Sequence, residues 1–266
     1  MTSMISFLLW ITSAFLVLNM ALYTFQDHYI LYPPSKSDFS DRIPNKHHIT
    51  LNINGVELNG IQRMERSSQN ITIIYFGGNA EDVNYNYFDF INALNANFVA
   101  INYRGFAGNP GKAKLEQISL DADAIIAQII ERFELKTERI ILMGRSLGSA
   151  FAINLVQKYD IAGIIAITPF DSLSKLGKRH YPFLPVSLLL KKDFNNVVIA
   201  KTSLKPILII SGDKDNIIPA IHSKTLYEAW QGNNKKFVTI KNAGHNNIQD
   251  FPAYYHEINK FIDSLK

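Results

Sequence analysis

The chain has 266 residues, 47% of them hydrophobic, and a formal net charge of +4, which is the composition of a folded protein with one large domain or two small ones. No block of five or six like charges occurs, so the charge pattern does not indicate a nucleic-acid-binding surface. The absence of cysteine excludes disulfides, thiolate catalysis and zinc–thiolate sites, and the seven histidines form no H-E-x-x-H pattern, so we expect neither a metal nor another cofactor.

The chain begins with an apolar segment. Residues 4–25 carry no charged side chain and match the roughly 20 residues with which a helix crosses a bilayer. A cleaved signal peptide or a buried core helix are the alternatives, but the segment lacks a basic n-region and a small-x-small cleavage site. We therefore predict an uncleaved single-pass membrane anchor at residues 1–26 and a connector at 27–47. Lys36, Arg42 and Lys46 follow the anchor, and the positive-inside rule then favours a cytoplasmic position for the rest of the chain.

A hairpin and a series of buried strands are predicted next. "HHITLNINGVELNGIQRM" (47–64) alternates apolar and polar residues on both sides of Asn54-Gly55, a dipeptide that suits a tight hairpin turn. The later apolar runs are short, rich in β-branched residues and almost continuous, which is typical of parallel strands buried on both faces. They cover residues 71–78, 98–105, 139–146, 161–170, 206–213 and 236–244.

Segments with helical spacing alternate with these strands. They cover residues 84–95, 116–133, 147–158, 219–231 and 252–264, and in the second of them we place Leu120 on the apolar side with Ile125 and Ile126. The alternation predicts an α/β domain over residues 48–266: a mostly parallel, doubly wound sheet with an N-terminal antiparallel hairpin and helices on both faces. We find no internal repeat.

One interval, residues 171–204, is too long for a simple crossover between strands. We interpret it as a helix plus a small lid-like insertion with the apolar centre "YPFLPVSLLL". This centre could line an acyl-binding pocket, rest against the membrane, or pack on the edge of the sheet.

Candidate catalytic residues lie where the strands end, because ligands of open α/β sheets bind outside the carboxyl ends of the strands. "MGRSLGSA" (143–150) places Ser146 between a strand and a helix, with Gly144 and Gly148 allowing a close approach, as in a nucleophile elbow. A serine nucleophile needs a base to take its proton and an acid to orient that base. The later strand ends provide two candidate acids, Asp213 and Asp215, and then His245, in the expected order.

The same chemistry requires two backbone donors for a developing oxyanion. The N–H of Leu147, directly after the serine, is the first. In "YFGGNAED" (75–82) Gly77 and Gly78 bend the chain after the first long buried strand, so the N–H of Asn79 is the expected second donor.

With these residues in place, the chain resembles the α/β-hydrolase superfamily, and within it the membrane-anchored serine hydrolases that include protein depalmitoylases. The resembling stretches are "FQDHYILYPP", "IYFGGNAEDV", "NYRGFAGNPGKA", "MGRSLGSA", "TPFDSL" with the "YPFLPVSLLL" that follows it, "ISGDKDNIIP" and "NAGHNN". The resemblance implies Asp215 as the acid, with Asp213 the runner-up. Gly77 stands where the family usually has His and Asn102 where it commonly has Asp, so another hydrogen bond must hold the oxyanion loop. We assign Arg145 a structural or pairing role.

The resemblance implies a serine hydrolase that cleaves esters or thioesters through an acyl-enzyme on Ser146, with His245 as general base and Asp215 as its orienting acid. The substrate would be a small-molecule acyl ester or a lipidated protein. A serine peptidase of the prolyl-oligopeptidase or aminopeptidase type is the alternative, and a non-catalytic binding protein on the same fold is a further one. The pattern favours no particular oligomeric state.

Overall fold

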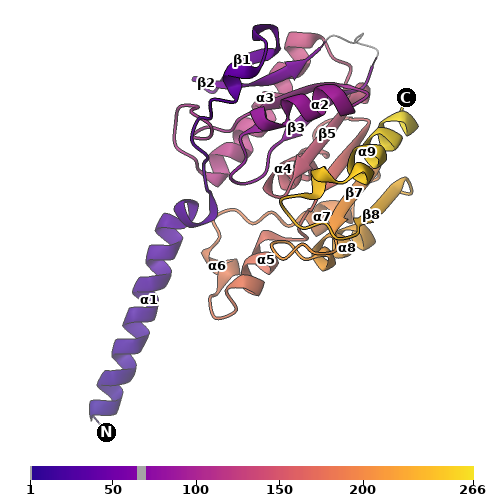
Figure 1. Cartoon of the computed structure of the whole chain (residues 1–266). Coiled ribbons are helices and arrows are strands. Elements are labelled where there is room, and N and C mark those ends of the chain that lie inside the picture. Colours follow the sequence, from indigo (N-terminus) through magenta and orange to yellow (C-terminus); the bar gives the residue numbers. More distant parts are fainter. Residues whose placement is uncertain (1, 65–69) are drawn as a thin grey trace.

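The computed structural model describes residues 2–64 and 70–266 of the chain. Its most conspicuous feature is α1 (Thr2–Ile30), a 29-residue helix that projects away from an α/β domain (Figure 1). Over Ser3–Ile30 this helix reaches a mean hydropathy of 2.0 in a window of which nothing is buried, so it is long and apolar enough to cross a membrane. The helix continues to Ile30, past the boundary at residue 26 that the sequence suggested.

Eight strands form one sheet in the order β1-β2-β4-β3-β5-β6-β7-β8. The strands β1 and β2 form an antiparallel hairpin, β2 pairs antiparallel with β4, and all remaining pairs are parallel. Asn54 and Gly55 both have positive φ at the hairpin turn, 51° and 78°, as the Asn-Gly signal predicts. The strands are β1 (His48–Ile53), β2 (Val56–Arg63), β3 (Thr72–Phe76), β4 (Asn97–Ile101), β5 (Ile140–Arg145), β6 (Gly163–Ile167), β7 (Ile207–Gly212) and β8 (Lys235–Ile240).

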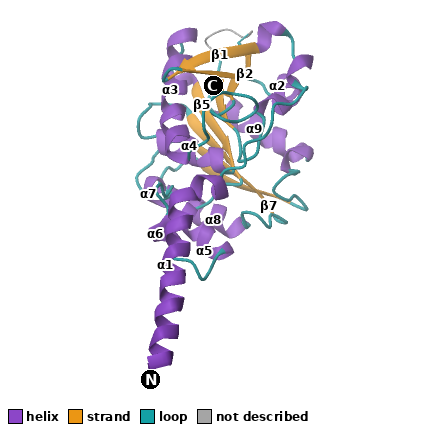
Figure 2. Cartoon of the chain, turned by 90° about the vertical axis from the view of Figure 1, so that its left-hand side faces the viewer, coloured by secondary structure: helices purple, strands orange, loops and turns teal. Residues whose placement is uncertain are grey.

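Helices cover both faces of this sheet, which confirms the α/β-hydrolase fold class. Figure 2 shows α3, α4 and α7 on one side of the sheet and α2 and α9 on the other. Alternate strand residues point to the two layers: Ile74 and Leu142 join one buried cluster, and Ile73 and Ile141 the other. The helices are α2 (Tyr87–Ala93), α3 (Leu115–Phe133), α4 (Leu147–Leu155), α5 (Leu173–His180), α6 (Val186–Leu189), α7 (Asn196–Ala200), α8 (Ala220–Ala229) and α9 (Pro252–Ser264), with short 3-10 helices at Ser40–Arg42, Asn45–His47, Val83–Asn86, Thr137–Arg139 and Ile248–Asp250.

The interval between β6 and β7 contains three short helices, α5, α6 and α7, of which α5 and α6 form the part nearest to α1 (Figure 1). One side-chain prediction was wrong: Leu120 on α3 is 59% exposed. Ile118, Ala122 and Ile125 face the sheet, and Leu120 lies about 200° around the helix from Ile118, so it points away from the core.

Candidate active site

Ser146 occupies a strained turn between β5 and α4. Its φ of 52° and ψ of −117° lie outside the regions that L-residues favour, as in a nucleophile elbow. The turn is so tight that a Cβ on Gly144 would lie 2.3 Å from the carbonyl oxygen of Gly148, and one on Gly148 would lie 2.1 Å from that of Phe76. Only glycine allows the strand, the turn and the helix to pack this closely.

The structure brings together the three side chains that the sequence singled out. The Nε2 atom of His245 lies 3.1 Å from Ser146 Oγ, and its Nδ1 lies 2.7 Å from Asp215 Oδ2. The other oxygen of Asp215 accepts hydrogen bonds from the backbone N–H groups of Ile217 and Ile218, at 2.9 and 2.7 Å. With Nδ1–H donating to Asp215, Nε2 is free to accept the hydroxyl proton of Ser146, which is the arrangement of a nucleophile, a base and an orienting acid.

Of the two candidate acids, Asp215 alone contacts His245. Asp213 is exposed, and its Oδ1 accepts a hydrogen bond from the N–H of Asn242 at 2.6 Å, which holds the loop after β8. The structure therefore gives Asp213 a loop-fastening contact and leaves Asp215 as the partner of the histidine.

The loop after β3 lies directly over the elbow. A Cβ on Gly78 would lie 3.6 Å from the carbonyl oxygen of Arg145 and 3.7 Å from Ser146 Cβ. In the part of the chain that the structure describes, neither Asn79 N–H nor Leu147 N–H has a hydrogen-bond acceptor. Both predicted oxyanion donors are thus unengaged beside the serine.

Three groups of hydrogen bonds hold this loop in the absence of the usual histidine at position 77. The hydroxyl of Tyr103 donates to the carbonyl oxygen of Gly77 at 2.8 Å, and the N–H of Gly78 donates to Glu81 Oε2 at 2.6 Å. The side-chain amide of Asn79 makes the third group, with the backbone of Ile30 and Tyr32. These hydrogen bonds hold the loop with glycine at position 77.

The Asn79 side chain fastens the loop to the end of α1. Its Nδ2 donates to the carbonyl oxygen of Ile30 at 2.6 Å, and its Oδ1 accepts from the N–H of Tyr32 at 2.9 Å. The oxyanion loop and the exit of the apolar helix are therefore in direct contact.

A buried ionic cluster supports both the loop and His245. Glu81 accepts from the hydroxyl of Tyr75 at 2.7 Å and lies 3.6 Å from Arg145, whose guanidinium also donates to the carbonyl oxygen of His245 at 2.9 Å. Burial and the charge of Glu81 raise the pKa of Tyr75 well above its ordinary value, so its phenol stays protonated. Burial lowers the pKa of Arg145, but Glu81 and its other neighbours outweigh this and the net pKa is raised. Arg145 therefore positions the histidine loop as a permanent cation, the pairing role expected from the sequence.

A cavity of about 420 Å³ adjoins the serine and the histidine, lined in part by Pro34, Gly78, Asn79, Ser146, His245 and Asn246. A larger cavity of about 550 Å³ lies between the connector and the β1–β2 edge and includes none of the three triad residues. Among the residues that the structure describes, no group of three or more His, Cys, Asp or Glu is placed to hold a metal ion.

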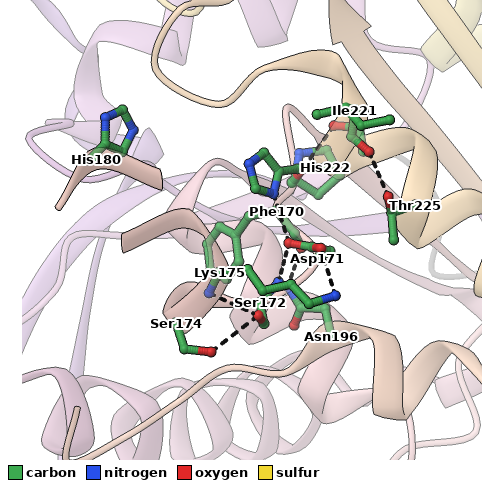
Figure 3. Close-up of polar contacts among 12 residues, drawn as sticks. Phe170, Asp171, Ser172, Ser174, Lys175, His180, Asn196, Ile221, His222 and Thr225 are labelled. Atoms are coloured by element: carbon green, nitrogen blue, oxygen red, sulfur yellow. Dashed lines mark hydrogen bonds and ion pairs between the residues drawn. The ribbon is translucent and has the colours of Figure 1, made fainter. Parts of the chain in front are cut away.

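A second buried histidine–aspartate pair lies after the carboxyl end of β6 and was missed from the sequence. In Figure 3, His222 of α8 points at Asp171, which follows β6, and Nδ1 lies 2.8 Å from Oδ1. Burial alone would raise the pKa of Asp171, but hydrogen bonds from His222, the Ser172 N–H and Lys175 hold it below its ordinary value. The position of Asp171 at the carboxyl end of a predicted strand was the available signal, because polar residues at such ends are site candidates.

Comparisons with known proteins agree with this geometry. A family described as serine aminopeptidase S33 matches residues 69–198. The esterase Pf2001 of Pyrococcus furiosus superposes with a TM-score of 0.69 over 88% of this chain and 99% of that one, at 20% identity. Est1E of Butyrivibrio proteoclasticus, solved with ferulic acid bound, superposes with a TM-score of 0.66 over 82% and 98%, at 14% identity. The chain therefore has the α/β-hydrolase fold.

The chain is also similar to curated proteins, one of which is named a membrane protein. An uncharacterized membrane protein of Saccharomyces cerevisiae is 32% identical over 167 residues, which is 60% of this chain and 58% of that protein. An uncharacterized protein of Mycobacterium tuberculosis is 31% identical over 156 residues, 59% of this chain and 55% of that protein, so the chain spans little more than half of its length. Human alpha/beta hydrolase domain-containing protein 17B is 24% identical over 198 residues, 72% and 66% of the two chains.

Proposed function

We propose that the chain is a membrane-anchored serine hydrolase that cleaves carboxylic esters or thioesters. The observation that carries the proposal is the hydrogen-bonded series from Asp215 through His245 to Ser146, at the carboxyl ends of β7, β8 and β5. The N–H groups of Asn79 and Leu147 support it, because Asn79 lines the cavity beside Ser146, Leu147 directly follows it, and neither N–H has an acceptor in the described part of the chain.

In the proposed reaction, Ser146 Oγ attacks the acyl carbonyl carbon while His245 Nε2 takes the hydroxyl proton. Asp215 stabilises the imidazolium, and the N–H groups of Asn79 and Leu147 stabilise the negative carbonyl oxygen. Collapse of this intermediate breaks the bond to the alcohol or thiol, which leaves with the proton from His245. Water then attacks the acyl-enzyme by the same steps and releases the carboxylic acid.

The proposed membrane anchor is α1, and its position favours substrates at a membrane surface. Ile30, whose carbonyl oxygen accepts from the Asn79 amide, follows the apolar stretch ending at Phe25 by five residues, an axial rise of about 7.5 Å. The candidate site would therefore lie near the bilayer surface, where acyl esters of lipids or lipidated proteins are found.

Replacement of Ser146 tests the assignment. We expect Ser146→Ala to abolish labelling by a fluorophosphonate probe and to lower ester turnover by at least about 10³-fold. Ser264→Ala, at an exposed position in the last turn of α9, is the matched control and should leave both unchanged. Undiminished turnover in Ser146→Ala would contradict the proposal.

An aminopeptidase is the second candidate, favoured by the exposed carboxylate of Asp89, which lines the cavity beside the serine. A carboxylate there could bind the ammonium group of a peptide N-terminus. Comparison of p-nitrophenyl acyl esters with aminoacyl p-nitroanilides distinguishes the two, and faster turnover of the anilides would favour the peptidase.

A further inference from the structure

The insertion between β6 and β7 extends beside α1. Figures 1 and 2 both show α5, α6 and the loop between them projecting from the domain on the same side as α1. The two parts are in contact, since Gln26 Nε2 donates to the carbonyl oxygen of Leu189 and Gln26 Oε1 accepts from the N–H of Lys191, both at 2.9 Å. The insertion therefore has a fixed position relative to the helix that we propose spans the membrane.

The tip of the insertion, residues 181–190, exposes large apolar side chains. Phe183 is 92% exposed and Leu188 is 79% exposed, and Tyr181 is also exposed. Exposed apolar side chains gathered on one projecting segment are typical of a surface that contacts a partner or a membrane, because contact with water is unfavourable. Nothing else in the described part of the chain covers these three side chains.

Only basic side chains carry charge in the insertion from Leu173 to Lys192. Lys175 is paired with Asp171, and the remaining four basic residues, Lys178, Arg179, Lys191 and Lys192, lie on the two flanks of the tip. Lys191 Nζ lies 5.2 Å from the ring centroid of Tyr23, near the end of the apolar run of α1. Tyrosine and lysine at the end of a spanning helix are typical of the headgroup region. The basic flank is thus at the depth at which lipid phosphates would lie.

We propose that this insertion is a second membrane contact: the tip enters the lipid layer and the four basic side chains bind the headgroups of anionic lipids. The partner is a bilayer that contains anionic lipid, chosen for the apolar tip, the charge complementarity and the continuity with α1. The proposal rests on the proposed role of α1 as an anchor.

The contact would also orient the candidate site. His180, the last residue of α5, has Nε2 3.0 Å from the carbonyl oxygen of Ile217, in the loop that holds Asp215. A membrane contact at the tip therefore fixes the acid loop, and not α1 alone, relative to the lipid surface.

Depth-dependent quenching of tryptophan fluorescence tests the apolar half of the proposal. The full chain carries tryptophan only at Trp10, in α1, and at the buried Trp230. In a Trp10→Phe background, the Leu188→Trp variant is compared with the Leu204→Trp variant. Leu204 is a matched control because it is 76% exposed and precedes the amino end of β7, whereas the insertion begins at the carboxyl end of β6. The protein is reconstituted into vesicles of phosphatidylcholine and phosphatidylglycerol at a ratio of about 7:3, a content chosen to give an anionic surface.

Phosphatidylcholine brominated near the start of the acyl chain should quench the fluorescence of the Leu188→Trp variant by more than about twofold, because the tip would be buried in lipid. The Leu204→Trp variant should be quenched no more than the Trp10→Phe protein, in which Trp230 is the remaining tryptophan. Equal quenching of the two variants would overturn the proposal. A blue-shifted emission without bromine quenching would also overturn it, because it would mean that a second copy of the chain or the domain itself covers the tip.

Charge reversal tests the electrostatic half. In the Leu188→Trp variant, the double change Lys178→Glu and Arg179→Glu should reduce the quenching, because it removes the attraction between the insertion and anionic headgroups. Replacement of phosphatidylglycerol by phosphatidylcholine should reduce it for the same reason, and about 0.5 M salt should reduce it by screening that attraction. Lys136→Glu, at an exposed position before β5, is the control and should have no effect. Quenching that stays the same after all three changes would contradict the role of anionic lipid.

Two separate measurements distinguish a failure of this membrane-contact proposal from a failure of the proposed function. Quenching of native Trp10 by lipid brominated deep in the acyl chains reports the anchor, and fluorophosphonate labelling of Ser146 reports the hydrolase site. If Trp10 is quenched and Ser146 is labelled while the tip variant is unaffected by bromine, the membrane contact is wrong and the anchor and the hydrolase stand.

Discussion

At the residue scale, the orientation of His245 depends on how hydrogen bonds are divided between the two carboxylate oxygens of Asp215. Asp215 Oδ1 accepts from the N–H groups of Ile217 and Ile218, which leaves Oδ2 for the imidazole. These two backbone donors hold the carboxylate in place, so that its second oxygen faces the imidazole. Asp213, two residues earlier, uses its carboxylate to fasten the loop at Asn242.

The first prediction separates these two acids. We expect Asp215→Asn to lower kcat by about 10³- to 10⁴-fold, because the amide fixes the wrong tautomer of His245 and cannot stabilise its charge. Asp213→Asn should change kcat by less than about threefold, since it touches only the loop. Ester turnover with circular dichroism as a check on folding measures both. A loss of similar size in the two variants would exclude Asp215 as the orienting acid.

The sequence predicted which residues would meet at the site but not every contact between them. Ser146 and His245 follow from strand ends, because parallel strands end at one edge of a sheet. Spacing could not choose between Asp213 and Asp215, since the choice depends on backbone hydrogen bonds inside one loop. The Asp171–His222 pair was not predicted. The strand end indicates Asp171 alone, and helical periodicity gives the face of His222 but not a partner 51 residues away.

At the element scale, the elbow depends on the close packing of α4 against the end of β3. Gly148, in the first turn of α4, lies so near β3 that a Cβ would be 2.1 Å from the carbonyl oxygen of Phe76 and 2.4 Å from that of Gly77. Backbone atoms cannot swing aside as a side chain can. A methyl group there must push the helix away from the strand and move Ser146 with it.

The second prediction follows from this packing. Gly148→Ala should lower the free energy of unfolding by about 3 kcal/mol, the upper part of the usual range for overpacking. Gly244→Ala is the control, because its Cβ would have no neighbour nearer than 3.4 Å, and it should change the stability by less than about 0.5 kcal/mol. Urea unfolding measures both, and equal midpoints would contradict the packing argument.

The helix α5 is fastened at both ends to the chain that follows β7. Asp171, just before α5, pairs with His222 of α8 (Figure 3). His180, at the end of α5, has Nε2 3.0 Å from the carbonyl oxygen of Ile217. Because the pKa of Asp171 is lowered on folding, its ionised form contributes stability that is complete above the unfolded pKa, near 3.8, and is lost as the pH falls through the lower folded pKa.

The third prediction uses this linkage. Asp171→Asn should lower the free energy of unfolding at pH 7 by about 2 kcal/mol, the value of hydrogen bonds to a charged group, and should flatten the fall in stability below about pH 4. Asp160→Asn is the control, because Asp160 also has a lowered pKa but pairs with Lys205 at the surface, so it should leave the stability almost unchanged. Urea unfolding at several pH values gives the comparison, and parallel pH profiles for wild type and Asp171→Asn would count against the pair.

The elements were predictable where burial explains the pattern. The hairpin, the parallel strands and helices such as α9 follow from alternation, apolar runs and helical spacing, and their bounds differ from expectation by only a few residues. The insertion was not predictable in detail. Its apolar tip is exposed in the folded domain, so no burial pattern specified where α5, α6 and α7 would begin and end.

At the scale of the whole molecule, the α1 exit, the oxyanion loop and the insertion meet on one side of the domain. The Asn79 amide contacts Ile30 and Tyr32, and Gln26 contacts Leu189 and Lys191. The candidate site therefore has one fixed relation to α1. If α1 is the anchor that we propose, its orientation decides on which side of the membrane the site lies.

The last prediction concerns that side. Before Met4 there is no Lys or Arg, whereas Lys36, Arg42 and Lys46 follow α1 within about 20 residues, the span over which the positive-inside rule acts. We expect the domain on the cytoplasmic side, so green fluorescent protein fused after Lys266 should fluoresce in bacterial cells and alkaline phosphatase fused there should be inactive. Three arginines inserted before Met4 should shift part of the population to the opposite orientation, because they place positive charge at the other end of α1. Active phosphatase in the unaltered fusion would place the candidate site outside the cytoplasm.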